Sequence, residues 1–227
     1  LSDLWEYDPL TNLWRWIKGT STFNANGIYG TKGVADVANN PGGRYYGYGG
    51  IINDKFYMFG GFGFGVAGGY GQLNDLWEFD MNTNNWRWLT GINATDGLGI
   101  YGTLQTYSST NTPSSRRTFT GAIGNGTLYV FGGFGNSQSP GGGQLNDLWE
   151  YDPTINQWRW LKGQTNINNI GVYGNVGVAS ASSLPGSREQ TVINYINGSL
   201  YLFGGRGYNS IAGNVYESDL WSFDPAT

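Results

Sequence analysis

The sequence contains no cysteine and no histidine. The first absence excludes disulfide bonds and thiol catalysis, and the second removes the commonest metal ligand and general base. Charge is also scarce, since Asp, Glu, Lys and Arg make up 12% of the chain and the formal net charge is −4. The 12 basic residues are not clustered, so we expect no nucleic-acid partner. No apolar run is long enough to cross a bilayer, so we expect no membrane insertion.

Aromatic residues and glycine, in contrast, are abundant. The 227 residues include 10 Trp, 16 Tyr, 11 Phe and 39 Gly. So much aromatic surface is unfavourable in water, so the chain is expected to fold and bury it. In a folded chain, the many glycines indicate frequent turns and not disorder. The length suits one domain of ordinary size. Residue 1 is Leu and no signal peptide is visible, so we expect that this is not the start of the gene product.

The tryptophans recur with a fixed period of 72 residues. All ten belong to three series: Trp5, Trp77, Trp149 and Trp221; Trp14, Trp86 and Trp158; Trp16, Trp88 and Trp160. Arginines at 44, 116 and 188 and Gly-Gly pairs at 60–61, 132–133 and 204–205 keep the same period. The repeats are therefore 1–72, 73–144 and 145–216, with the start of a fourth at 217–227. A period of this length indicates a propeller or a solenoid.

One period predicts four antiparallel strands, at 44–52, 55–61, 74–80 and 85–89 in the first complete example. Asn53-Asp54, like Asn125-Gly126 and Asn197-Gly198 one and two periods later, predicts a tight hairpin turn whose two central residues have positive φ. The second strand is apolar on both faces, and radial stacking of such sheets, as in a β-propeller, covers both. The glycine pair at its end predicts a close backbone approach.

The recurring order of an apolar strand, Gly-Gly, "NDLWEYD", a spacer and Trp resembles the kelch repeat, and it occurs three times in register. This resemblance implies an all-β fold of kelch-type β-propeller blades, about three of them, forming one propeller or propeller segment over 1–227. The inserts, such as 19–44, make the period longer than a usual kelch blade. They resemble the long tandem repeats of bacterial surface and secreted proteins, which implies an extracellular or cell-surface location.

One face of the blades carries the candidate binding residues. In an up-and-down blade, the inserts and the connections from the second to the third strand (62–72, 134–144 and 206–216) lie on the same side, and loops on a rigid scaffold commonly carry function. The candidates there are Phe62, Phe64, Tyr70, Phe134, Arg206, Tyr208, Tyr29, Tyr101 and Tyr173. Exposed aromatic side chains suit protein contacts or stacking on sugar rings. The alternatives are that the insert tyrosines pack locally and that the other candidates cap glycine-rich loops. We expect the repeated tryptophans to form a core between blades.

The carboxylates do not indicate catalysis. Eleven of the 16 keep the period, whereas a catalytic pair should occur once, so we expect them to satisfy turns or to pair with the periodic arginines. The other five are Asp36, Asp54, Asp96, Glu189 and Glu217, which form no acid–base motif. We therefore expect no catalytic residue, no transition-metal site and no cofactor, while calcium on loop oxygens stays open. A copper galactose oxidase is built on a kelch propeller, but its site needs histidine ligands and a Cys–Tyr crosslink, which this chain lacks.

The main functional hypothesis is a non-catalytic binding or structural module, whose partner is another protein or further copies or repeats of the chain itself. The alternative is a carbohydrate-binding lectin or adhesin. Asn93, Asn125 and Asn197 match the glycosylation sequon, although the last two are explained by hairpin turns. Because the sequence begins and ends within a third strand, we expect a longer tandem array, or a ring or fibre completed by another copy, in preference to a self-closed three-blade propeller.

Overall fold

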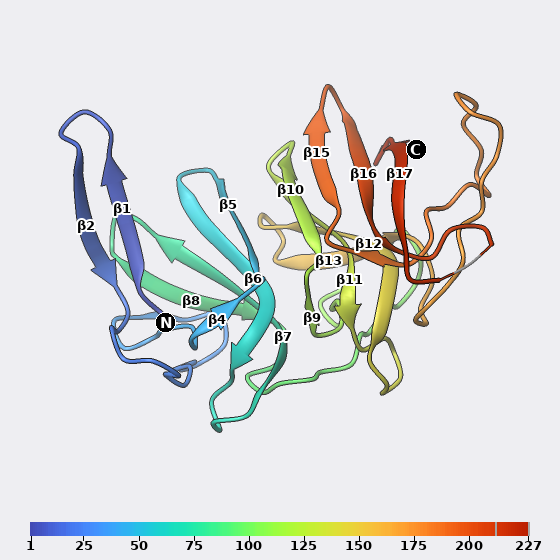
Figure 1. The fold of residues 1–227 in the computed structure, drawn as a ribbon. Helices are drawn as coiled ribbons and strands as arrows, with labels where there is room; N and C mark the ends of the chain where they lie inside the picture. The colour runs from blue at the N-terminus through green and yellow to red at the C-terminus, as the bar shows by residue number, and fades with distance from the viewer. Residues whose placement is uncertain (212, 227) are drawn as a thin grey trace.

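The computed structural model describes residues 1–211 and 213–226 as an all-β arrangement of four antiparallel sheets. The sheets follow one another along the chain, with the two termini at opposite ends of the row (Figure 1). No helix occurs in the described part of the chain, so no described segment is a helix that could span a membrane. The all-β class predicted from the sequence is confirmed.

The row begins with an N-terminal hairpin and the first complete blade. The hairpin pairs β1 (Leu4–Asp8) with β2 (Leu13–Lys18), which are the third and fourth strands of a repeat. The first complete blade has the order β5 (Tyr48–Ile52), β6 (Lys55–Phe64), β7 (Tyr70–Asp80) and β8 (Asn85–Thr90). Two short strands extend it, β3 (Ala35–Asp36) on β8 and β4 (Arg44–Tyr45) on β6.

The row continues with the second complete blade and a three-stranded C-terminal blade. The second complete blade has the order β10 (Thr120–Gly124), β11 (Thr127–Gly135), β12 (Gly143–Asp152) and β13 (Gln157–Lys162), with β9 (Arg116–Arg117) on β11. The C-terminal blade contains β15 (Val192–Ile196), β16 (Ser199–Gly207) and β17 (Val215–Phe223), with β14 (Arg188–Glu189) on β16. Four strands per repeat are thus confirmed in both complete blades.

The hairpin turns between the first and second strands have the predicted conformation. Asn53 and Asp54 have φ values of 47° and 60°, and Asn125, Gly126, Asn197 and Gly198 also have positive φ. Asn, Asp and Gly tolerate this left-handed region, which the twist of the flanking strands favours in a two-residue turn. The turn residues therefore set the register of β5 on β6 and of its two equivalents.

The first and second strands differ from the prediction in their lengths. The segment 44–52 is split into β4 and β5 because Tyr46 has a φ of 59° and interrupts the strand. Across from it, a Cβ on Gly61 would lie 2.7 Å from the carbonyl oxygen of Tyr45, which confirms the close approach at the glycine pair. The register shifts at this bulge and β6 then continues to Phe64. The predicted loop 62–72 is therefore mostly strand, and only 65–69 connects β6 to β7.

The hydrophobic core lies between neighbouring blades. Tyr57 and Phe59 on one face of the first complete blade pack in one cluster with Trp149, Tyr151 and Trp158 of the second. Equivalent clusters join the other sheets. The expectation that the tryptophans form this core is confirmed for the complete blades. It is wrong for three tryptophans of the N-terminal hairpin: Trp5, Trp14 and Trp16, which are 49%, 66% and 49% exposed, because no described blade covers the outer face of the hairpin.

Candidate functional site

Each insert, which precedes the first strand of a blade, packs on that blade. Its tyrosine contacts an aspartate on the third strand of the same blade. The Tyr101 hydroxyl donates to Asp147 Oδ2 at 2.8 Å, and Tyr29 donates to Asp75 Oδ2 at 2.6 Å. Both rings are buried. Tyr173 makes the same bond to Asp219 but stays 40% exposed. The buried positions of Tyr29 and Tyr101 favour local packing over contact with a partner.

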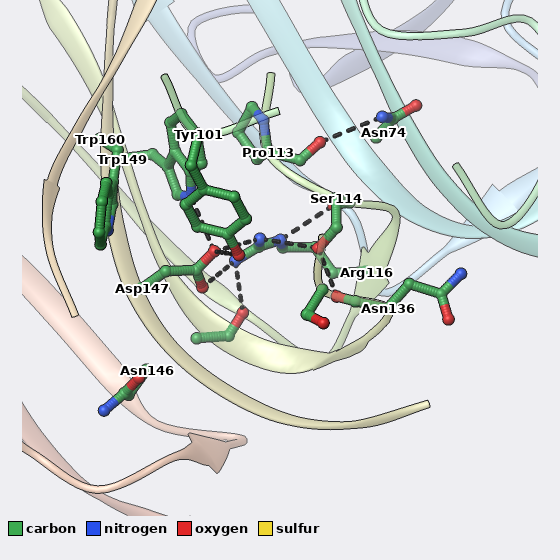
Figure 2. Close-up of polar contacts among 12 residues, drawn as sticks. Asn74, Tyr101, Pro113, Ser114, Arg116, Asn136, Asn146, Asp147, Trp149 and Trp160 are labelled. Carbon is green, nitrogen blue, oxygen red and sulfur yellow. Dashed lines mark hydrogen bonds and ion pairs between the residues drawn. The ribbon is translucent and has the colours of Figure 1, made fainter. Parts of the chain in front are cut away.

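The aspartate that receives the tyrosine belongs to a buried ion pair, shown for the second complete blade in Figure 2. Arg116 Nη1 and Nη2 each lie 2.7 Å from an oxygen of Asp147, which gives a bidentate pair whose two side chains are 0% exposed. Trp149 Nε1 donates to the same carboxylate at 2.7 Å, and Arg116 also donates to the carbonyl of Gly132. The cluster links an insert to β9, β11 and β12.

The ion pair keeps its carboxylate ionised in the first complete blade. Burial alone would raise the pKa of Asp75, but the charge and hydrogen bonds of Arg44, together with those from Tyr29 and Trp77, lower it below the usual value. A carboxylate held by three donors in this way has little capacity to exchange protons. We therefore interpret these clusters as structural crosslinks within the blade.

The predicted structural role of the periodic carboxylates is confirmed. The three glutamates pair with the arginine directly across the strand pair, as Glu6 with Arg15, Glu78 with Arg87 and Glu150 with Arg159. The four turn aspartates each accept a hydrogen bond from the backbone N–H two residues later: Asp8, Asp80, Asp152 and Asp224. Asp75, Asp147 and Asp219 hold the buried arginines.

We expect the stability of the fold to decrease steeply between about pH 10 and pH 12. Burial raises the pKa of Tyr129 to about 12, and burial with the hydrogen bond to Asp219 raises the pKa of Tyr173 to about 12. A phenol with a raised pKa holds its proton more tightly in the folded state. Its stabilisation is complete below the unfolded pKa of about 10 and is lost as the pH rises through the folded value.

Melting temperatures measured from pH 7 upward test this expectation. Tyr129→Phe removes one titrating phenol, so its melting temperature should fall less steeply above about pH 10. An unchanged slope in this variant would show that Tyr129 does not contribute to the alkaline transition.

A second group of side chains forms the candidate binding site at the loop ends of the two complete blades. We call it the aromatic strip and define it as Tyr45, Phe62, Phe64, Tyr70, Arg117 and Phe134. In the first complete blade, the Tyr70 ring lies 4.7 Å from Phe62 and 5.0 Å from Phe64, and its hydroxyl lies 3.0 Å from that of Tyr45. The structure thus brings four of the sequence-predicted residues, Phe62, Phe64, Tyr70 and Phe134, into one group.

Arg117 joins the two blades within the strip. Its guanidinium carbon lies 4.8 Å from the ring centroid of Phe62 and 5.0 Å from that of Phe134. The cation therefore contacts the face of one ring from each blade, an arrangement that is favourable because each ring face is electron-rich. Tyr45 and Tyr70 remain about half exposed, so the strip is open to a partner.

The remaining predicted residues lie in the C-terminal blade. Arg206 occupies the repeat position of Phe62 and Phe134, and it forms an ion pair with Glu189 at 3.6 Å. Tyr208 lies in the connection between β16 and β17, where a Cβ on Gly213 would meet its ring at 2.3 Å. This position agrees with the alternative that Tyr208 covers its own glycine-containing loop.

Tyr45 and Arg117 were not among the residues predicted from the sequence. Positions 45, 117 and 189 hold Tyr, Arg and Glu, so they break the repeat immediately after the invariant arginines at 44, 116 and 188. The same criterion that selected Phe62 would have found them. They were missed because they lie in the predicted first strand and not in a predicted loop.

Comparison with known proteins agrees with this architecture. A family model described as "Kelch motif" matches residues 115–159, which run from β9 into β13 and so cover one blade. The same unit recurs in register every 72 residues. The resemblance to the kelch repeat is therefore confirmed by a family model for this blade.

No curated protein matches the chain. A solved structure titled "Structure of YjhT" is similar, with 23% sequence identity and a TM-score of 0.42. The match covers 78% of this chain but 36% of that one.

Proposed function

We propose that this chain is a non-catalytic binding module that contacts a protein partner through the aromatic strip. The observation that carries the proposal is the convergence of Phe62, Tyr70, Arg117 and Phe134 across the boundary between two blades. Aromatic residues and arginine are enriched at the energetic centres of protein interfaces. A strip carried by strands is also held rigidly, which lowers the entropy lost on binding.

The roles of the charged residues support a non-catalytic function. The periodic acids serve turns and ion pairs, as described above, and no group of three or more Asp or Glu suited to a metal was found within the described residues. The low charge of the chain and its many glycine, asparagine and threonine residues fit an exposed module of an extracellular or cell-surface protein, and we include that location in the proposal.

Selection from a displayed random-peptide library tests the proposal. We expect the wild-type protein to enrich peptides that no longer bind a Phe62→Ala/Tyr70→Ala variant, because the change removes two adjoining rings of the strip. Tyr208→Ala is the matched control, since it removes an aromatic side chain from the loop of a different blade. Peptides that bind all three proteins equally would contradict the proposal, as would the absence of any enrichment.

Carbohydrate binding is the second candidate function. Tyr45, Tyr46 and Tyr70 are 46%, 56% and 54% exposed, and the rings of Tyr45 and Tyr46 lie 4.6 Å apart. Such rings can stack on the apolar faces of sugars while their hydroxyls form hydrogen bonds. A glycan array read with wild type and with Tyr70→Ala tests it. A glycan hit that Tyr70→Ala loses would favour this function, and an array without hits would exclude it for the glycans tested.

A further inference from the structure

Arg117 differs from every other arginine of the chain in its electrostatic environment. Seven of the eight arginines form an ion pair with a carboxylate: Arg15, Arg44, Arg87, Arg116, Arg159, Arg188 and Arg206. Arg117 forms none with any described residue. Its guanidinium instead lies over the rings of Phe62 and Phe134.

The ring contacts leave the hydrogen-bond donors of Arg117 for another group. A guanidinium has five N–H donors, and neither phenylalanine ring offers them an oxygen acceptor. Two parallel donors along one edge of the guanidinium match the two oxygens of a carboxylate. The neighbouring rings lower the local dielectric constant and so strengthen such a bond.

The C-terminal blade shows which partner an arginine takes on this surface. Arg206 stands at the repeat position of Phe134 and pairs with Glu189, which stands at the repeat position of Arg117. Glu189 also accepts a hydrogen bond from the Thr118 hydroxyl at 2.7 Å, beside Arg117 in the chain. A glutamate side chain is therefore accommodated beside this surface, whereas Arg117 lacks one of its own.

We propose that Arg117 binds an aspartate or glutamate carboxylate of the partner protein, while apolar groups next to that residue lie on Phe62 and Tyr70. This inference rests on the proposed function and deepens it, because it gives the partner segment an acidic character. The net charge of the chain is −4, so attraction of an acidic segment must come from a local cation and not from the protein as a whole.

Binding of immobilised poly-L-glutamate, measured by interferometry at low and at physiological salt, tests the inference. We expect Arg117→Gln to weaken binding about ten- to a hundredfold, because a hydrogen-bonded charge pair is lost. The affinity of Arg117→Lys should lie between those of the wild type and Arg117→Gln, since lysine keeps the charge but not the paired donors. Arg15→Gln is the control, because Arg15 is an exposed arginine on the N-terminal hairpin, and it should leave binding unchanged.

Several outcomes would overturn the inference. These are no binding of poly-L-glutamate by the wild type, equal binding by Arg117→Gln, or equal weakening by Arg15→Gln. Preferential binding of polygalacturonate would assign the site to an acidic polysaccharide and would also contradict it. Melting temperatures of the variants show that each is folded.

The peptide selection separates this inference from the function on which it rests. Peptides that need Phe62 and Tyr70 but bind Arg117→Gln as well as they bind the wild type would leave the proposed function standing and refute the acidic partner.

Discussion

Trp149→Ala is expected to lower the free energy of unfolding by about 3–5 kcal/mol, because it opens a large cavity in the core. Trp149 is 0% exposed and belongs to the cluster between the two complete blades. Its ring lies 4.9 Å from Tyr101, and its Nε1 donates to Asp147. The substitution therefore removes packing between two sheets and one donor to a buried carboxylate at the same time.

Trp5→Ala provides the matched control, since Trp5 occupies the same repeat position in the N-terminal hairpin. It is 49% exposed and stacks on Trp16, with the two ring centroids 6.1 Å apart. We expect a loss of about 1 kcal/mol or less, because a partly solvated side chain leaves no closed cavity. Denaturant unfolding of both variants measures the difference. Similar losses would show that the core does not lie between the blades as described.

Asp147→Asn is expected to destabilise the protein by about 3–5 kcal/mol, because it leaves the Arg116 charge buried without a counter-charge. The guanidinium is fully buried, so water cannot replace the lost carboxylate. The Asn side chain has nearly the shape of Asp, which makes the charge and not the volume the main change. Adding Arg116→Met should recover part of the loss, since it removes the uncompensated charge.

Asp3→Asn is the control for this second prediction. Asp3 stands 144 residues before Asp147 at the same repeat position and accepts a hydrogen bond from Trp5 Nε1 at 2.7 Å. The position of its arginine would lie before residue 1, and the amide oxygen of Asn can still accept the Trp5 bond. We expect a change within about 0.5 kcal/mol. Chemical denaturation compares the two substitutions, and equal effects would contradict a special role for the buried pair.

Most of the fold could be predicted from the sequence because the interactions that form a blade are local and repeated. Asn125-Gly126 sets a hairpin through the conformations these residues tolerate, and the alternation in "NWRWL" places two tryptophans on one face of the strand. The repeat itself indicated that the periodic acids were structural. A side chain that recurs in every blade serves each blade, whereas a catalytic pair should occur once. The ion pairs of Asp75, Asp147 and Asp219 bear this out.

The length of the second strand could not be predicted, because it depends on a bulge. Glycine pairs commonly end a strand, but here Gly60 and Gly61 take positive φ and allow β6 to continue to Phe64. The interruption of the neighbouring strand at Tyr46 could not be predicted either, since a tyrosine has no preference for a φ of 59°. Only the pairing of the two strands makes both conformations necessary.

The sequence by itself determined the repeat, the strands of each blade, the tight turns and the candidate aromatic residues. The tertiary structure alone decided which of those residues meet. Tyr101 is buried and donates a hydrogen bond to Asp147, whereas Phe62 and Phe134, which belong to separate blades, both contact Arg117. The physical reason is that backbone preferences act over a few neighbouring residues, while a site across two sheets depends on how the sheets stack, and stacking is set by side chains distant in the sequence.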